Sequence, residues 1–304
     1  MKIFFSIFFT CYTLLVFSQT KTTYIYAIKE IDTLKLDVYS SDSIQQIGKK
    51  LPVLLWMHGG GFSSGTRDSK YETELCQFAA QNGFIGISIS YRLLRKGTKT
   101  GFGCDCPKEI KQEILKQATI DYLDAAAFIV DNAEKLNIDP NYLIAGGSSA
   151  GAEGVANAVF MRNYFISDIQ HYENVKFAGL FSCAGAIINA EYINKDNAIP
   201  SVFFHGTDDK LVPFGKASHH YCSSEKPGYL ILEGSNEIVK KLELYETPYY
   251  FNIVKGGGHE LAGIPFGDLK EVFKFFNQTI VEEKIIQTVI IQTKTAEAKT
   301  VEAK

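Results

Sequence analysis

The chain has 304 residues, which is enough for one or two globular domains. Hydrophobic residues make up 46% and charged residues 21%, a balance that excludes disordered and fibrous classes and allows a substantial core. The formal net charge is −3, so there is no surplus of basic residues to neutralise phosphates, and nucleic acid is not an expected partner.

The first 18 residues have the pattern of a secretory signal peptide. Lys2 supplies a positive charge, residues 3–17 are mostly apolar, and Val16 and Ser18 are acceptable residues before a cleavage site. The apolar run is shorter than the ~20 residues that a membrane-spanning helix needs. We therefore expect a mature protein that begins near Gln19, has no stable membrane span after cleavage, and is secreted or periplasmic. The alternative is a retained N-terminal anchor.

The first part of the mature chain predicts strands on either side of a helix. Two short strands are expected in residues 22–40, because residues 33–39 (TLKLDVY) alternate between apolar and polar side chains. Residues 52–57 and 84–90 are apolar runs bounded by Gly or Pro, which is typical of strands covered on both faces. Residues 69–81, between these two runs, are expected to form a helix.

The same alternation continues along the chain. A long helix is expected at residues 108–136, with apolar side chains along one face. Further strands are expected at residues 142–145, 177–182, 201–204 and 249–254, and further helices at residues 150–160, 236–245 and 269–281. This order predicts an α/β fold with a mainly parallel central sheet, an antiparallel N-terminal edge and helices on both faces.

No change in composition divides the mature chain, so we expect a single domain at residues 19–283. Shortly after it, the sequence Ile-Ile-Gln-Thr occurs twice, beginning at Ile285 and at Ile290, and the chain ends in KTAEAKTVEAK. We expect residues 284–304 to be a solvated, flexible tail that follows a completed core.

Six cysteines are present, and one lies in the predicted signal peptide, so an odd number remains and at least one thiol stays unpaired. Cys104 and Cys106 are separated by one residue, which disfavours a disulfide between them, and no second cluster follows at zinc-like spacing. We expect one of the two to pair with Cys76 or Cys222. We expect Cys183, at the end of an apolar strand, to stay free and buried. The alternative is that all of them are reduced.

Ser149 lies in a G-x-S-x-G pattern formed by residues 147–151. The pattern follows a predicted strand (YLIAGG) and precedes a predicted helix of small residues (AGAEGVANAV). A sharp strand-to-helix turn of this kind holds the serine in a strained conformation, and the flanking glycines permit close packing. The alternative is an ordinary glycine-rich turn with a serine at the helix N-cap.

A second glycine-rich segment, His58-Gly59-Gly60-Gly61, directly follows the strand predicted at residues 52–57. Three successive glycines let the backbone turn its N–H groups toward one point, as stabilisation of a tetrahedral oxyanion requires. The alternative is a flexible turn without a binding role.

An acid and a histidine follow the serine, in the order Ser, Asp, His. Residues 205–213 match the pattern H-G-x-x-D-x-x-V-P, which favours Asp209 over Asp208 as the acid. Of the six histidines, His259 alone follows the last predicted core strand. Ser149, Asp209 and His259 each come just after a parallel strand, at the edge where open α/β sheets place their sites.

With these motifs the chain resembles carboxylesterases of the α/β-hydrolase superfamily, in the branch that carries HGGG and includes hormone-sensitive-lipase-like and bacterial feruloyl or acetyl esterase-like enzymes. The resemblance extends over residues 30–283. It implies that the three residues just named form a catalytic triad and that the amides of Gly60, Gly61 and Ala150 form an oxyanion hole. The chain departs from the hormone-sensitive-lipase-like group because residues 22–40 predict strands where those enzymes have a helical cap.

The resemblance implies a serine esterase that forms an acyl-enzyme and needs no cofactor or metal ion. Its expected partner is a small-molecule or carbohydrate-linked ester, and the oligomeric state stays open. We expect residues 92–107 and 187–198 to wall the pocket; their charged residues predict a shallow, polar-rimmed site for short acyl groups, acetyl first. The alternatives are an acyltransferase or a serine peptidase on the same fold, or a non-catalytic binding relative.

Overall fold

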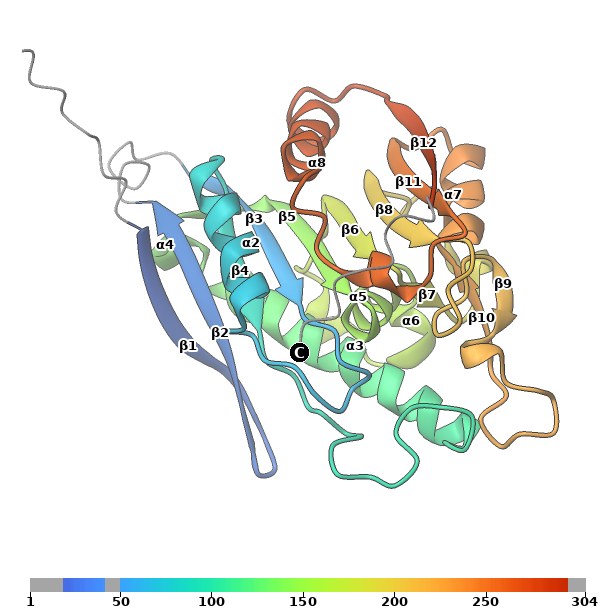
Figure 1. Cartoon of the computed structure of the whole chain (residues 1–304). Coiled ribbons are helices and arrows are strands. Elements are labelled where there is room, and N and C mark those ends of the chain that lie inside the picture. Colours follow the sequence, from blue (N-terminus) through green and yellow to red (C-terminus); the bar gives the residue numbers. More distant parts are fainter. Residues whose placement is uncertain (1–18, 42–49, 295–304) are drawn as a thin grey trace, which may run out of the picture.

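The computed structural model describes residues 19–41 and 50–294 (Figure 1). The predicted signal peptide, residues 1–18, lies outside the described residues, as do the last ten positions of the expected tail. Within the described ranges, no helix is both long enough and apolar enough to cross a membrane.

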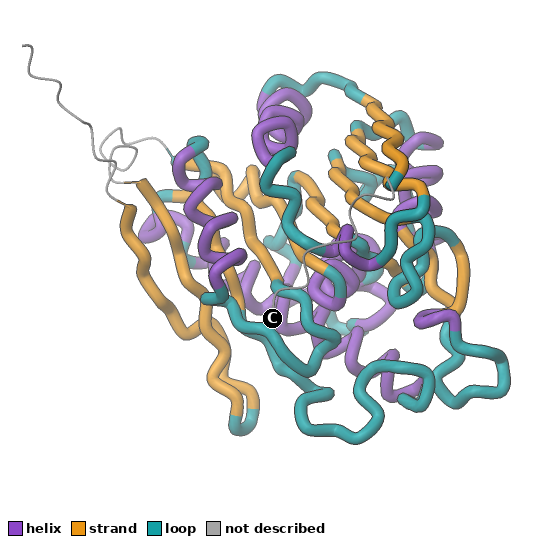
Figure 2. Tube along the Cα trace, viewed as in Figure 1, coloured by secondary structure: helices purple, strands orange, loops and turns teal. Residues whose placement is uncertain are grey.

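A twisted nine-stranded sheet forms the centre of the described part (Figure 2). In spatial order its strands are Gln19–Lys29 (β1), Asp32–Ser41 (β2), Ile85–Ile89 (β4), Leu51–Met57 (β3), Ile138–Ser148 (β5), Gly179–Cys183 (β6), Ser201–Gly206 (β8), Tyr249–Lys255 (β11) and Gln287–Thr293 (β12). The pairs β1–β2 and β2–β4 are antiparallel, and every pair from β4 to β12 is parallel. The predicted fold class, including the antiparallel N-terminal edge, is confirmed.

Helices cover both faces of this sheet (Figure 1). One face packs against Lys108–Asp131 (α3), Ala150–Phe160 (α5) and Ser235–Leu244 (α7), and the other against Lys70–Gln81 (α2) and Leu269–Phe276 (α8). Successive side chains of β3 point to opposite faces, so Leu55 joins the first core and Trp56 the second. The continuous apolar run of this strand follows from burial on both sides.

Two predicted helices are shorter than expected. The helix predicted at residues 108–136 is interrupted at Asn132, whose side-chain amide donates to the Phe128 carbonyl at 2.8 Å, and Ala133–Leu136 (α4) follows. The helix predicted at residues 269–281 is α-helical only to Phe276 and continues as a π-helical turn. The remaining short helices are Arg162–Phe165 (α6), Gln170–Tyr172 (η1), Ala190–Tyr192 (η2), His219–Tyr221 (η3), His259–Ala262 (η4) and the π-helical Asn277–Val281 (η5).

The expectation of a solvated tail from residue 284 onward is wrong for its first half. Gln287–Thr293 forms β12 and pairs in parallel with β11, at the edge of the sheet. Ile286 and Ile290 pack against the α8 core, whereas Val289 and Ile291 are about half exposed. The half-buried pattern of an edge strand therefore explains the apolar residues of the repeated segment.

A second, three-stranded sheet was not predicted. It consists of Ala186–Ile187 (β7), Ile231–Gly234 (β10) and Lys216–Ser218 (β9). These strands are too short to show an alternating pattern in the sequence. They hold the connections after β6 and β8 beside the carboxyl edge of the main sheet.

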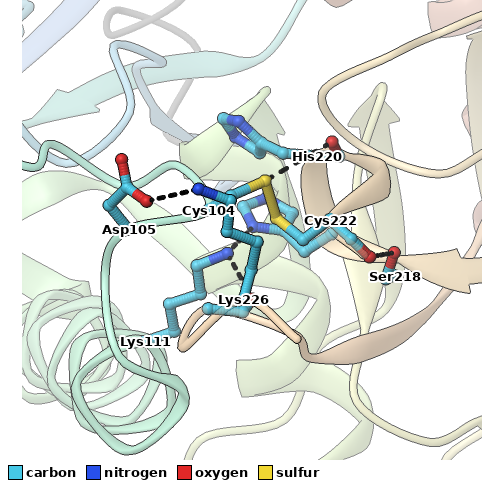
Figure 3. The surroundings of a disulfide bond; sticks show 9 residues. Cys104, Asp105, Lys111, Ser218, His220, Cys222 and Lys226 are labelled. Carbon is cyan, nitrogen blue, oxygen red and sulfur yellow. Dashed lines mark hydrogen bonds and ion pairs between the residues drawn. A yellow bond between two sulfur atoms is a disulfide. The ribbon is translucent and has the colours of Figure 1, made fainter. Parts of the chain in front are cut away.

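The predicted cysteine staple is confirmed as a disulfide between Cys104 and Cys222 (Figure 3). Cys183 is free and buried, as expected, and Cys76 and Cys106 are also free and buried. The bond joins the loop before α3 to the segment after β9, two parts of the chain that are 118 positions apart.

Candidate active site

Ser149 lies at the sharp turn between β5 and α5. Its backbone has φ 51° and ψ −124°, a conformation that is strained for a residue with a side chain, and its N–H donates to the Cys183 carbonyl at 2.8 Å. A Cβ atom on Gly151 would lie 2.2 Å from the Met57 carbonyl oxygen, and one on Gly147 would lie 2.7 Å from the Gly151 backbone. The two motif glycines are therefore required for the close packing of strand and helix that exposes this serine.

The structure brings the predicted serine, histidine and acid into one hydrogen-bonded row. Ser149 Oγ lies 2.7 Å from His259 Nε2, and His259 Nδ1 lies 2.7 Å from Asp209 Oδ2. Asp209 and His259 follow β8 and β11, whose parallel pairing through β6 places their carboxyl ends at the same edge of the sheet as that of β5. This arrangement allows the imidazole to take a proton from the serine while the carboxylate orients the ring.

Asp209 is buried and fully hydrogen-bonded. Its Oδ1 accepts from the backbone N–H groups of Leu211 (2.8 Å) and Val212 (3.0 Å), and its Oδ2 also lies 3.5 Å from His205 Nε2. Burial raises the pKa of this carboxyl, but hydrogen bonds from His205, His259 and the Leu211 backbone outweigh burial and hold the pKa well below its usual range. The group is therefore an anion at neutral pH.

Asp208 takes a different position. Its side chain is exposed and accepts a hydrogen bond from the Thr207 hydroxyl at 3.0 Å. The geometry therefore favours Asp209 as the acid, as the sequence pattern does.

The HGGG segment leaves β3 and curves around the same site. Gly60 has φ +116° and Gly61 φ +60°, and a Cβ on Gly60 would lie 2.1 Å from the Ser64 carbonyl oxygen, so this turn depends on glycine. The Tyr91 hydroxyl donates to the His58 carbonyl at 3.0 Å and fixes the base of the loop. Gly60, Gly61 and Ala150, the three predicted oxyanion donors, line one cleft.

This cleft has a volume of about 460 Å³ and contains Ser149 and His259. Phe102, from the predicted wall at residues 92–107, lines it, but no residue of the second predicted wall, 187–198, does so. That expectation is wrong: the second segment begins in the small sheet, where Ile187 pairs with Glu233 of β10, and it does not line the cleft. The segment with His219 and His220 and the turn after His259 take its place.

Sequence reasoning missed Glu153 and His219, two buried polar residues that line the cleft beside the predicted site. Glu153 lies one helical turn after Ser149, with its N–H bonded to the Ser149 carbonyl at 2.9 Å, and its Oε1 lies 3.3 Å from His219 Nε2. Both side chains are 1% exposed. The signal in the sequence was a glutamate among the small residues of the predicted helix AGAEGVANAV, because a glutamate is rarely buried without a partner.

Comparison with known sequences is consistent with this geometry. The BD-FAE family model matches residues 36–187, which is half of the chain. A secreted triacylglycerol lipase of Gibberella zeae is 29% identical over 154 residues, which cover 50% of this chain and 25% of that protein. The phenmedipham hydrolase of Pseudarthrobacter oxydans is 34% identical over 110 residues, covering 36% of this chain and 20% of that protein. The chain thus matches only about a quarter or less of the length of these relatives.

Solved structures match over a larger part of the chain. The apo form of Thermogutta terrifontis esterase 2 superposes with a TM-score of 0.60 at 17% identity, covering 88% of this chain and 96% of that one. The propionate-bound form of the same esterase gives a TM-score of 0.58. At this identity the similarity shows that the fold is shared.

Proposed function

The chain belongs to the BD-FAE family, and on that premise we propose that it is a serine carboxylesterase with Ser149 as nucleophile, His259 as general base and Asp209 as the orienting acid. The observation that carries the proposal is the unbroken row of two 2.7 Å contacts from Ser149 Oγ through His259 to Asp209, at the edge of an open cleft. The esterases and lipases among the relatives support the same class of reaction.

In the first half of the reaction, Ser149 Oγ attacks the ester carbonyl carbon as its proton passes to His259 Nε2. The anionic Asp209 stabilises the imidazolium that forms, because its Oδ2 faces Nδ1 at 2.7 Å. The carbonyl oxygen becomes an oxyanion, and we assign its stabilisation to the amides of Gly60, Gly61 and Ala150, which line the cleft with Ser149. Collapse of this intermediate breaks the bond to the alcohol, which leaves with the proton from His259.

In the second half, water attacks the acyl-enzyme. His259 accepts a proton from the water and returns it to Ser149 Oγ, which releases the carboxylic acid. His259 therefore accepts and returns every proton that is transferred in this cycle.

We further propose a preference for short acyl groups. Each methylene of an acyl chain contributes ~0.8 kcal/mol only if it is buried. Much of the lining of the cleft is glycine, serine and histidine, with Phe102, Leu211 and Val212 as its larger apolar side chains, so it offers little surface that could bury a long chain. Acetyl and other short acyl esters of small molecules or carbohydrates fit such a site best.

We also propose that the protein is exported. The predicted signal peptide supports this, as do the secreted lipases among the relatives. A disulfide between Cys104 and Cys222 is compatible with an oxidising compartment. Amino-terminal sequencing of the mature protein from its native host tests export: a start near Gln19 supports it, and a retained Met1 contradicts it.

Rapid mixing with p-nitrophenyl acetate tests the esterase proposal. An active serine esterase releases one equivalent of p-nitrophenol per active site in a burst when deacylation limits turnover, and Ser149→Ala eliminates both burst and turnover. A wild-type protein that is folded but hydrolyses no carboxylic ester in a broad panel would overturn the proposal.

A further inference from the structure

The proposed mechanism does not use two buried polar residues of the cleft. Glu153 and His219 line the cleft together with Ser149, yet neither contacts His259 or Asp209 by a hydrogen bond in the described part of the chain. Burying a carboxyl and an imidazole opposes folding unless both are paired. In the described part of the chain, Glu153 Oε1 is buried without a well-aligned hydrogen-bond partner, and this uncompensated burial indicates a function in the cleft.

Lys111 contacts His219 on the ring nitrogen that does not face Glu153. The Lys111 side chain is fully buried, and its Nζ donates to the Gly228 carbonyl at 2.9 Å and lies 3.3 Å from His219 Nδ1. An ammonium group can only donate, so His219 Nδ1 is the acceptor and its Nε2 carries the hydrogen. His219 Nε2 lies 3.3 Å from Glu153 Oε1, within ion-pair distance but without the alignment of a hydrogen bond.

Lys111, His219 and Glu153 form a second row of polar contacts, and Glu153 is the member nearest to Ser149 in the sequence. Burial raises the pKa of its carboxyl, the Lys111 ammonium lowers it and the Asp209 carboxylate raises it, and the net value is about 8, so the group is mostly a neutral carboxylic acid at pH 7. Its Oε1 accepts no well-aligned hydrogen bond from any residue that the structure describes. A neutral acid in this state has both a donor and an acceptor to offer to a molecule in the cleft.

A disulfide joins the two parts of the chain that contain Lys111 and His219, and Figure 3 shows this bond with Lys111 beside it. The Cys104–Cys222 bond joins the loop before α3, which contains Phe102 and leads to Lys111, to the segment that contains His219. The Gly228 N–H also donates to the Cys104 carbonyl at 2.9 Å. The ring of Phe102 packs edge-on against that of His219, at a centroid distance of 4.9 Å, and provides an apolar wall beside the acid.

We propose that Glu153, supported by His219 and Lys111, is a substrate-recognition residue that hydrogen-bonds a hydroxyl group close to the scissile ester. This inference rests on the proposed esterase function. A neutral hydroxyl both donates and accepts, as the neutral acid does, whereas an ammonium group on the substrate would approach the buried Lys111 ammonium. A carboxylate on the substrate would be disfavoured by the Asp209 anion, whose charge already acts on Glu153. The hydroxyl can belong to the acyl part or to the alcohol part of the ester.

Two matched pairs of substrates test the proposal and distinguish these sources. The acyl pair is p-nitrophenyl 3-hydroxybutyrate and p-nitrophenyl butyrate, and the alcohol pair is glycerol monoacetate and propyl acetate. In one pair, the wild-type protein should prefer the hydroxylated member by at least about tenfold in kcat/KM, because the buried acid is left unpaired by the other member. The pair that shows the preference identifies the part of the ester that Glu153 contacts.

Three variants separate recognition from general stability. Glu153→Met fills a similar volume without hydrogen-bonding groups and should reduce the preference to about twofold or less. Glu153→Gln keeps a donor and an acceptor and should retain most of the preference. Glu173→Met, at an exposed glutamate outside the cleft, should keep the wild-type preference.

The ratio within each pair is the decisive measurement, because a loss of folded protein lowers both members equally. A wild-type protein that hydrolyses p-nitrophenyl acetate but shows no preference in either pair overturns the recognition role and leaves the esterase proposal intact. A preference that persists in Glu153→Met also overturns it. If Glu153→Met does not fold, the wild-type ratios and the Glu153→Gln ratio still decide the question. A wild-type protein without activity on any of these esters contradicts the esterase function itself.

Discussion

Asp209 contacts His259 with one carboxylate oxygen and the backbone with the other. Oδ2 lies 2.7 Å from His259 Nδ1, and Oδ1 accepts from the N–H groups of Leu211 and Val212. A carboxylate can only accept hydrogen bonds, so each of its partners must donate, and His259 therefore carries its hydrogen on Nδ1. The side chain is locked in a single orientation that fixes the imidazole toward Ser149.

This relationship predicts the effect of Asp209→Asn. An asparagine amide would set its NH₂ group against either the two backbone N–H groups or His259 Nδ1, and in the second case the ring adopts the wrong tautomer. We expect kcat to fall by about 10⁴-fold. Asp208→Asn, at an exposed neighbour, should change kcat by no more than about twofold. Steady-state kinetics of both variants test this assignment, and a larger loss for Asp208→Asn would reverse it.

Ser149→Ala should reduce esterase turnover by about 10⁴-fold or more, because the nucleophile is absent. Ser148 is the matched control: its hydroxyl donates to the Ala262 carbonyl at 2.8 Å and does not contact His259 in the described structure. Ser148→Ala should keep measurable turnover, and both variants should melt within a few degrees of the wild type. An active Ser149→Ala beside an inactive Ser148→Ala would show that the wrong serine has been assigned.

The length of the acyl chain should have a strong effect on kcat/KM. The open cleft buries few methylenes, so kcat/KM should be greatest for p-nitrophenyl acetate or butyrate and should fall for octanoate and palmitate. The four esters are compared below their solubility limits. A maximum at octanoate or beyond would indicate an acyl-binding surface that the described residues do not form.

Glu153→Gln should change how stability depends on pH. The carboxyl has an ordinary pKa of 4.5 and a folded-state pKa of about 8, so between these values the folded protein binds a proton that the unfolded chain releases. Its contribution to the free energy of unfolding is therefore fully present below about pH 4.5 and is lost as pH rises to about 8.

Glutamine does not ionise, so Tm of Glu153→Gln minus Tm of the wild type should increase steadily from pH 5 to pH 8. The lowered pKa of Asp209 affects stability only when the pH falls below the ordinary value of 3.8, outside this range. Thermal melts at four pH values check the prediction, and a Tm difference that is constant across them would contradict it.

Loss of the disulfide should destabilise the protein. The bond closes a loop of 118 positions, and removal of such a constraint from the unfolded chain costs about 2–4 kcal/mol of stability. The double variant Cys104→Ser/Cys222→Ser should therefore melt at a lower temperature than the wild type. Addition of dithiothreitol should lower Tm of the wild type and leave that of the double variant unchanged; an equal effect on both would mean that the reductant acts elsewhere.

Local patterns were sufficient to predict the sheet and to single out Ser149, Asp209 and His259, which lie in one hydrogen-bonded row. The apolar runs before His58, Ser149, Asp209 and His259 identify parallel strands, and the parallel register then brings the ends of those strands together without further information. The turn at Ser149 requires glycine at Gly147 and Gly151, because a Cβ at either position would collide with backbone, and this requirement appears directly as the G-x-S-x-G pattern. These features follow from steric and periodic rules that act over a few residues.

Other features depend on pairing between distant segments, and the sequence does not contain them in local form. The edge strand β12 has a pattern that a solvated tail can also have, and only its register with β11 distinguishes the two. Residues 187–198 do not line the cleft as predicted, and Ile187 instead pairs with β10, a contact that no local pattern indicates.

The sequence by itself determined the fold class and the identity and order of Ser149, Asp209 and His259, because each lies in a short motif whose geometry is local. Only the tertiary structure decided what else enters the cleft. Lys111 and His219 are 108 positions apart, and their contact, together with the approach of His219 to Glu153, depends on a disulfide and on the packing of the loops that it joins. Helix α5 places Glu153 one turn after Ser149, but only long-range packing brings His219 and Lys111 to that acid, and no local sequence rule encodes their arrival.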